Sequence, residues 1–115
     1  MHEPGTWLKV ARIDDLPPSG SRVVHVAGRK IALFRLSSGV IRAIDNRCPH
    51  KGGPLGEGIV SGEYVFCPLH DWKINLSDGQ VQAPDTGCTE TFPTQVRDGI
   101  LYLLMEKAAR VEVEV

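Results

Sequence analysis

Hydrophobic residues fall in short runs along the chain, and glycine or proline separates most runs from the next. Several runs alternate hydrophobic with polar positions or are rich in Val and Ile, which is typical of β-strands, whereas no segment keeps a helical period. The pattern predicts strands at Leu8–Ala11, Arg22–Val26, Lys30–Leu36, Val40–Asp45, Glu63–Phe66, Asp71–Asn75, Val81–Gln82, Thr94–Arg97 and Ile100–Leu104.

Turn-forming residues indicate antiparallel pairing of these strands. Gly39, Gly62, Gly79 and Gly99 each follow Ser or Asp between hydrophobic runs, and glycine accepts the positive φ that tight hairpin turns require. The segment Ile13–Pro17 predicts at most one helical turn, because its prolines end it. We therefore expect an all-β fold, a small antiparallel β-sandwich or barrel.

Size and charge exclude several functions. The chain has 115 residues, 42% of them hydrophobic, which suits one domain. Its 13 basic and 14 acidic residues give a net charge of −1, and no block of Lys or Arg offers the surface that nucleic acids or anionic membranes require. No hydrophobic run approaches the roughly 20 residues of a membrane-spanning helix, and no secretory signal is visible, so we expect a cytoplasmic protein.

The C-terminal residues are expected to stand outside the main domain. We assign residues 1–106 to the domain and residues 107–115 to a tail. The tail ends Val111-Glu112-Val113-Glu114-Val115, which alternates with a period of two. Two interpretations stay open: an added edge strand, or a frayed end that orders only against a partner, such as a second copy in a homo-oligomer.

Two short segments carry residues with metal-binding chemistry. Cys48-Pro49-His50 and Cys67-Pro68-Leu69-His70 each provide one thiol and one imidazole, in loops that follow predicted strands. Thiolates and neutral imidazoles are strong ligands for zinc, copper and iron. The candidate ligands of one metal centre are therefore Cys48, His50, Cys67 and His70.

The pattern Cys-x-His, sixteen intervening residues and Cys-x-x-His resembles the Rieske family, over nearly the whole chain. The resemblance implies that Cys48 and Cys67 hold one iron of a 2Fe-2S cluster, that His50 and His70 hold the other, and that residues of about 45–75 form a cluster-binding subdomain. It also implies one-electron transfer, with catalysis left to a partner. On ligand type alone, a structural zinc module is the alternative of another class.

Mixed ligation, if the resemblance holds, also predicts the electrochemistry. Two ferric ions, two sulfides and two thiolates sum to zero charge, so Rieske potentials lie at roughly −150 to +300 mV, against about −400 mV for plant-type ferredoxins. High-potential members of the family have an inter-loop disulfide and hydroxyl donors where this chain has Gly53, Leu69, Trp72 and Ile74. We therefore expect a potential at the low end of the range.

Within the family, the second loop looks like the small subunit of NADH-dependent assimilatory nitrite reductase. The residues that carry this likeness are Cys67-Pro68-Leu69-His70-Asp71-Trp72 and Ala83-Pro84-Asp85-Thr86-Gly87-Cys88. It implies a large partner subunit with flavin, a four-iron cluster and sirohaem, which reduces nitrite to ammonia in nitrate assimilation. The alternative is the ferredoxin component of a ring-hydroxylating dioxygenase, although such ferredoxins more often have Trp and Gly where this chain has Leu69 and Asp71.

Other residues have simpler interpretations. Cys88 has no histidine near it and is expected to be a half-buried structural cysteine, the alternative being a thiol adjacent to the cluster. Lys51 and Lys73 flank the ligand loops, where they either steer an acidic partner or are ordinary solvated side chains. Trp72 is either a shield over the cluster or a plain core or rim residue. The residues expected in the core on aromatic character alone are Trp7, Phe34 and Phe66.

Overall fold

The structure is a computed structural model that describes residues 5–26, 28–49, 52–69, 71–105 and 111–113. Over these residues it consists of strands and two short 3-10 helices, and neither helix is long and apolar enough to cross a membrane. The all-β prediction is confirmed. The elements are β1 (Thr6–Arg12), η1 (Ile13–Asp15), β2 (Ser21–Val26), β3 (Arg29–Arg35), β4 (Ile41–Asp45), η2 (Leu55–Glu57), β5 (Ile59–Ser61), β6 (Tyr64–Phe66), β7 (Lys73–Asn75), β8 (Thr91–Phe92), β9 (Thr94–Arg97), β10 (Ile100–Met105) and β11 (Val111–Val113).

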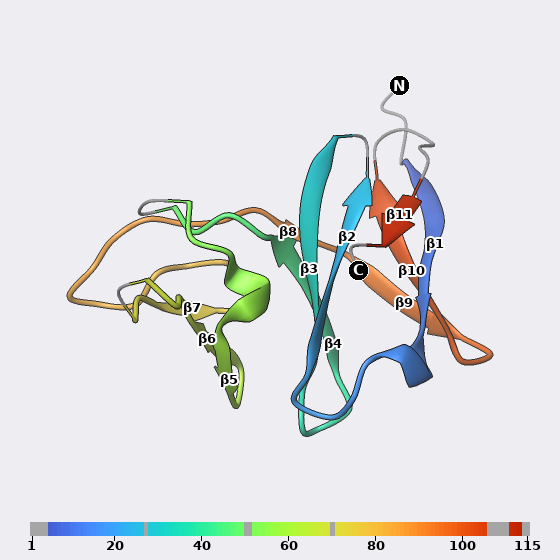
Figure 1. Cartoon of the computed structure of the whole chain (residues 1–115), viewed down its shortest axis with the longest axis horizontal. Coiled ribbons are helices and arrows are strands. Elements are labelled where there is room, and N and C mark those ends of the chain that lie inside the picture. Colours follow the sequence, from blue (N-terminus) through green and yellow to red (C-terminus); the bar gives the residue numbers. More distant parts are fainter. Residues whose placement is uncertain (1–4, 27, 50–51, 70, 106–110, 114–115) are drawn as a thin grey trace.

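The strands form three antiparallel sheets (Figure 1). The first sheet has the order β1-β10-β9, the second β11-β2-β3-β4-β8 and the third β5-β6-β7. Figure 1 shows the second sheet between the other two, so that the third sheet lies on the far side from β1 and β10. The loops that carry the cysteines follow β4 of the second sheet and β6 of the third, and Figure 1 shows both on the side of the molecule away from β1 and β10.

Strand β3 divides the hydrophobic interior into two cores. It is hydrophobic at four successive positions, and all four side chains are fully buried. Because successive side chains of a strand point to opposite faces, Ile31 and Leu33 join one core while Ala32 and Phe34 join the other. The first core is shared with β1 and β10, and the second contains both cysteines of the predicted metal centre. The candidate metal loops therefore rest on the face of the central sheet.

Several strand predictions need correction. Val81–Gln82 is not a strand, because Val81 makes only an isolated bridge to Ile74. The strand expected from Asp71 begins at Lys73, since Asp71 has a φ of 55°, which an extended strand cannot contain. Strands β5 and β8, of three and two residues, were not predicted, because segments so short show no periodicity.

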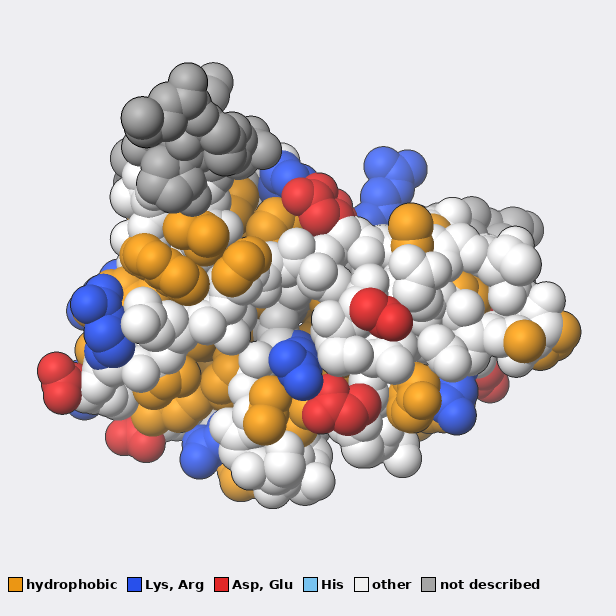
Figure 2. Space-filling view, turned by 180° about the vertical axis from the view of Figure 1, so that it is seen from behind, with side chains coloured by type: hydrophobic (Ala, Val, Ile, Leu, Met, Phe, Trp, Pro, Cys, Tyr) orange, Lys and Arg blue, Asp and Glu red, His pale blue; other side chains and the backbone are white. Residues whose placement is uncertain are grey.

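The three aromatic residues expected in the core differ in how deeply they are buried. Phe34 is fully buried and Phe66 is half-buried, but Trp7 is 39% exposed, so its prediction was wrong. Trp7 lies opposite Leu104 on β10. The residues on either side of Leu104, Leu103 and Met105, are buried in the core, so Leu104 and its partner Trp7 face the opposite side of the sheet, toward solvent. Figure 2 shows hydrophobic side chains gathered over this side of the molecule.

Part of the C-terminal tail forms strand β11. Val111 lies opposite Val26 and Val113 opposite Val24, so β11 extends the second sheet beyond β2. This pairing is what the edge-strand interpretation predicts. The neighbouring residues 106–110 and 114–115 lie outside the described residues, and a homo-oligomer formed through the tail stays a prediction.

Candidate metal centre

The first cysteine loop leaves the end of β4 and is closed by its own backbone. Cys48 is 2% exposed. Its backbone N–H donates to the carbonyl oxygen of Gly53 at 2.9 Å, and its carbonyl oxygen accepts from the N–H of Gly52, also at 2.9 Å. Gly52 has a φ of 72°, a left-handed conformation that glycine adopts without steric penalty. The loop therefore turns the thiol inward while its own polar groups stay paired.

The second cysteine loop follows β6 and repeats this geometry. Cys67 is also 2% exposed. Its N–H donates to the carbonyl oxygen of Trp72, and its carbonyl oxygen accepts from the N–H of Asp71, both at 2.9 Å. The bonds join the cysteine to the residues four and five positions later, as in the first loop, and Asp71 has the left-handed backbone that Gly52 has there. Two segments with different sequences thus present their thiols from the same local fold.

The two loops are in direct contact through a glycine. A Cβ atom built on Gly53 would lie 2.7 Å from the Sγ atom of Cys67 and 3.0 Å from Cγ of Leu69. The backbone of the first loop therefore lies against the thiol of the second, at a distance that no side chain at position 53 permits. Neither Cys48 nor Cys67 forms a disulfide, and both belong to one buried cluster.

The predicted histidine ligands, His50 and His70, lie outside the described residues. Among the residues that are described, no group of three His, Cys, Asp or Glu side chains is close enough to hold a metal ion. The complete four-ligand set thus stays a prediction. The described half of the set fits a thiolate-held centre, because two buried cysteines on matching loops belong to one cluster, and the glycine backbone of the first loop lies against the thiol of the second.

A buried asparagine fixes the first loop to the central sheet. Asn46 is 8% exposed, and its side-chain Oδ1 accepts from the N–H of Gly56 at 2.7 Å. Its backbone N–H donates to the carbonyl oxygen of Lys30, and its carbonyl oxygen accepts from the N–H of Leu55. The residue ties both ends of the loop together. This role of Asn46 is not visible in the sequence, because its partners are distant in the chain and a lone Asn in a loop carries no specific pattern.

Ionic contacts hold the same loop on its outer side. Arg29 Nη2 donates to Asp45 Oδ2 at 3.1 Å and to Glu90 Oε1 at 2.6 Å, and the Arg29 guanidinium lies 5.0 Å from the ring centre of Phe92. The hydrogen bond to Glu90 is the main cause of the raised pKa of Arg29. The other carboxylate oxygen of Asp45 accepts from the N–H of Arg47, the residue before Cys48. A chain of contacts thus links β3 and β8 to the first loop.

We expect Arg29→Gln to loosen the first loop without unfolding the protein. The change removes one exposed and one partly buried ion pair and the contact with Phe92, so the free energy of unfolding falls by only about 1 kcal/mol. Hydrogen exchange at the amides of Arg47 and Cys48 should accelerate. The matched control is Arg42→Gln, which breaks a similarly exposed pair with Glu63 away from the loop. Equal exchange in both variants would show that Arg29 does not hold the loop.

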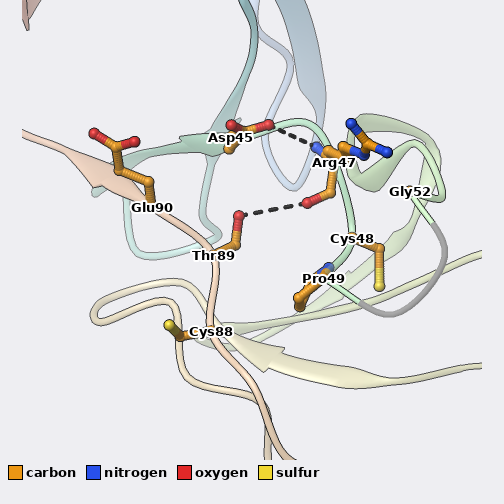
Figure 3. A pocket seen from close by; sticks show the side chains of 8 residues that line it. All are labelled: Asp45, Arg47, Cys48, Pro49, Gly52, Cys88, Thr89 and Glu90. Atoms are coloured by element: carbon orange, nitrogen blue, oxygen red, sulfur yellow. Dashed lines mark hydrogen bonds between the residues drawn. The ribbon is translucent and has the colours of Figure 1, made fainter.

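A surface cavity lies beside the first loop (Figure 3). Its volume is about 510 Å³. Figure 3 shows that the segment around Thr89 forms its other wall, where the Thr89 hydroxyl donates to the carbonyl oxygen of Arg47 at 3.5 Å. Cys88 lines this wall and is exposed, so the expectation of a half-buried cysteine was wrong: the isolated bridge from Cys88 to Gln80 holds the backbone at the surface. The lining residues are Asp45, Arg47, Cys48, Pro49, Gly52, Cys88, Thr89 and Glu90.

Two other residues near the loops have definite positions. Trp72 is half-buried and packs against the core that contains the two cysteines. Lys73 places its Nζ 4.3 Å from the ring centre of Tyr64, a cation–π contact that holds the ammonium against the third sheet. Lys51 lies outside the described residues. A role for either lysine in docking stays a prediction.

Comparison with known proteins gives a family match over most of the chain. The family profile of the Rieske [2Fe-2S] domain matches residues 6–93. A ferredoxin component of naphthalene 1,2-dioxygenase/salicylate 5-hydroxylase systems from Ralstonia sp is 32% identical over 101 residues, which are 87% of this chain and 96% of the relative. In contrast, the chain spans only 27% of a matching oxygenase component of 3-ketosteroid-9-alpha-monooxygenase from Mycolicibacterium smegmatis, at 35% identity over 84% of this chain.

Solved structures give the same picture. A chain from the complex of reduced oxygenase and oxidised ferredoxin in carbazole 1,9a-dioxygenase has a TM-score of 0.79 and 29% identity, covering 89% of this chain and 95% of its own length. A protein described as a nitrite reductase NADPH small subunit has a TM-score of 0.78 and 28% identity, covering 87% of this chain and 99% of its own length. The two similarities are equal in strength.

Proposed function

The chain belongs to the Rieske [2Fe-2S] domain family, and on that basis we propose that Cys48 and Cys67 hold one iron of the cluster and His50 and His70 the other. The observation that carries the proposal is the pair of matching loops, each of which presents a buried thiol, in contact through Gly53. Residues of about 45–75 then form the cluster-binding part of a domain that extends over residues 1–106.

Domains of this family transfer electrons, and when bound the cluster supplies a site that accepts and donates one electron. The contribution of this chain is to keep water from the thiolates, which are buried, and to hold both loops rigid through paired backbone groups. Neutral imidazoles at His50 and His70 would keep the oxidised centre uncharged. We infer that the chain is a cytoplasmic electron carrier and that catalysis belongs to a partner protein.

Two partners are candidates, and each is supported by one observation. The ferredoxin role is supported by the Ralstonia relative, which this chain matches over 96% of its length. The nitrite reductase role is supported by the second loop, Cys67-Pro68-Leu69-His70-Asp71-Trp72, and by the 28% identical protein described as a nitrite reductase small subunit. In the first case the chain passes electrons to an oxygenase; in the second it acts beside a flavin and sirohaem subunit that reduces nitrite.

Analysis of the purified protein tests the cluster. We expect two iron atoms and two acid-labile sulfides per chain, a reddish-brown colour, and a low-average-g electron paramagnetic resonance signal after dithionite. Cys88→Ser should retain all three, because Cys88 is exposed and is not among the four ligands. A colourless protein with stoichiometric zinc would overturn the proposal in favour of a structural zinc module. Loss of iron in Cys88→Ser would contradict the ligand set.

Reconstitution with a partner distinguishes the two roles. If the chain is a nitrite reductase subunit, its omission should lower ammonia formation from NADH and nitrite by the purified sirohaem subunit. If it is a ferredoxin component, its omission should stop electron flow from a reductase to a ring-hydroxylating oxygenase. Activity that is independent of the chain in one assay excludes that role.

A further inference from the structure

The two cysteine loops have the same left-handed backbone conformation four residues after Cys48 and Cys67, but a different residue adopts it in each loop. This residue is Gly52 in the first loop, with a φ of 72°, and Asp71 in the second, with a φ of 55°. Glycine adopts this conformation freely, whereas a residue with a Cβ does so against a steric penalty, which Asp and Asn bear better than most others. The second loop therefore keeps a charged side chain at a position where glycine would be the more stable choice.

The carboxylate of Asp71 is not used to hold the loop together. Asp71 is exposed, and its only hydrogen bond among the described residues is made by its backbone N–H to Cys67. The nearest cation in sequence, Lys73, lies instead over the ring of Tyr64. The charge is accompanied by exposed Pro68 and by Leu69, which is 52% exposed. Among the residues that the structure describes, no cation pairs with this carboxylate, which lies in the exposed part of the loop near two exposed hydrophobic side chains.

We propose that Asp71 is a specificity-determining residue, whose fixed negative charge lowers the reduction potential of the centre and favours redox partners with a basic docking surface. The inference rests on the proposed function, in which Cys67 and His70 of the same loop hold the cluster. An added electron makes the centre more negative, and a nearby carboxylate opposes that addition, so removal of the carboxylate raises the potential. The same charge attracts a basic partner and repels an acidic one, mainly through the association rate.

Two substitutions separate the charge from the backbone conformation. Asp71→Asn removes the charge but keeps a residue that tolerates positive φ, while Asp71→Gly removes both the charge and the steric penalty. Asp98 offers a matched control, because it is exposed, has a φ of 52°, and lies in the turn between β9 and β10. Asp98→Asn and Asp98→Gly repeat the same changes far along the chain from the cysteine loops.

The experiment measures the reduction potential at low and high ionic strength. We expect Asp71→Asn and Asp71→Gly to have equally raised potentials at low salt, with a smaller difference at high salt, and both Asp98 variants to match the parent. Reduction of cytochrome c, a basic protein, by either Asp71 variant should slow by about two- to threefold at low salt, the factor that one pair of unit charges gives at several ångströms in water. Reduction of uncharged benzoquinone should change much less.

The outcomes separate this inference from the proposed function. A parent protein without an iron–sulfur cluster would overturn the proposed function itself. A parent with the cluster, whose potential and cytochrome c kinetics are the same in Asp71→Asn and Asp98→Asn, would overturn only the role of Asp71. A raised potential in Asp71→Gly but not in Asp71→Asn would assign the effect to the backbone and would also overturn it.

Discussion

Gly53→Ala should abolish stable binding of the cluster while leaving the rest of the fold intact. The new Cβ would lie 2.7 Å from the Sγ atom of Cys67, so the thiol or the first loop must move. Overpacking of this kind costs about 1–3 kcal/mol, which the two hydrophobic cores can absorb. A displaced thiolate, in contrast, cannot keep its bond length to iron. We therefore expect most of the iron to be lost from the purified variant, with strand content unchanged by circular dichroism.

The control for this variant is Gly62→Ala in the turn between β5 and β6. Gly62 has a φ of 59°, and a Cβ there would meet no atom within 4 Å. The substitution strains the backbone of the third sheet without touching either cysteine, so the free energy of unfolding should fall somewhat while the iron content stays that of the parent. Full iron content and an unchanged resonance signal in Gly53→Ala would show that the loops do not meet at this glycine.

The strands whose hydrophobic pattern extends over several residues could be predicted from the sequence. The hydrophobic run of β3 predicted a strand, and its two buried faces explain how one strand supports two cores. The cysteine loops could be placed after β4 and β6 because proline and glycine interrupt the pattern there. Cys48 and Cys67 do lie in loops that follow strands, and both belong to one core, while their role as metal ligands stays a prediction.

What the sequence did not show depends on contacts between distant residues. Arg29 forms an ion pair with Glu90, which lies 61 positions away in the sequence, and no local sequence pattern predicts such a pair. The equivalence of Gly52 and Asp71 is a matter of backbone dihedrals, and it becomes visible only when the hydrogen bonds of the two loops are compared. The outward position of Trp7 likewise follows from its register with β10, which a single strand does not determine.

His70→Cys should lower the reduction potential of the protein. With the proposed ligands, two thiolates and two neutral imidazoles, the oxidised centre would be neutral, and a third thiolate would add one negative charge. Since four thiolates bring plant-type clusters to about −400 mV, against roughly −150 mV at the low end of the Rieske range, one exchange should lower the potential on the order of 100 mV. Protein-film voltammetry measures this shift directly, and the resonance signal should move toward that of an all-cysteine cluster.

The matched control for this change is His25→Cys, which adds a thiol on β2, outside both loops. It should leave the potential unchanged, because His25 is not a predicted ligand. An unchanged or raised potential in His70→Cys, with the cluster retained, would contradict the charge argument. If instead the cluster is lost from both His70→Cys and His50→Cys but kept in His25→Cys, both imidazoles are required for binding the cluster, which supports the proposed set of four ligands.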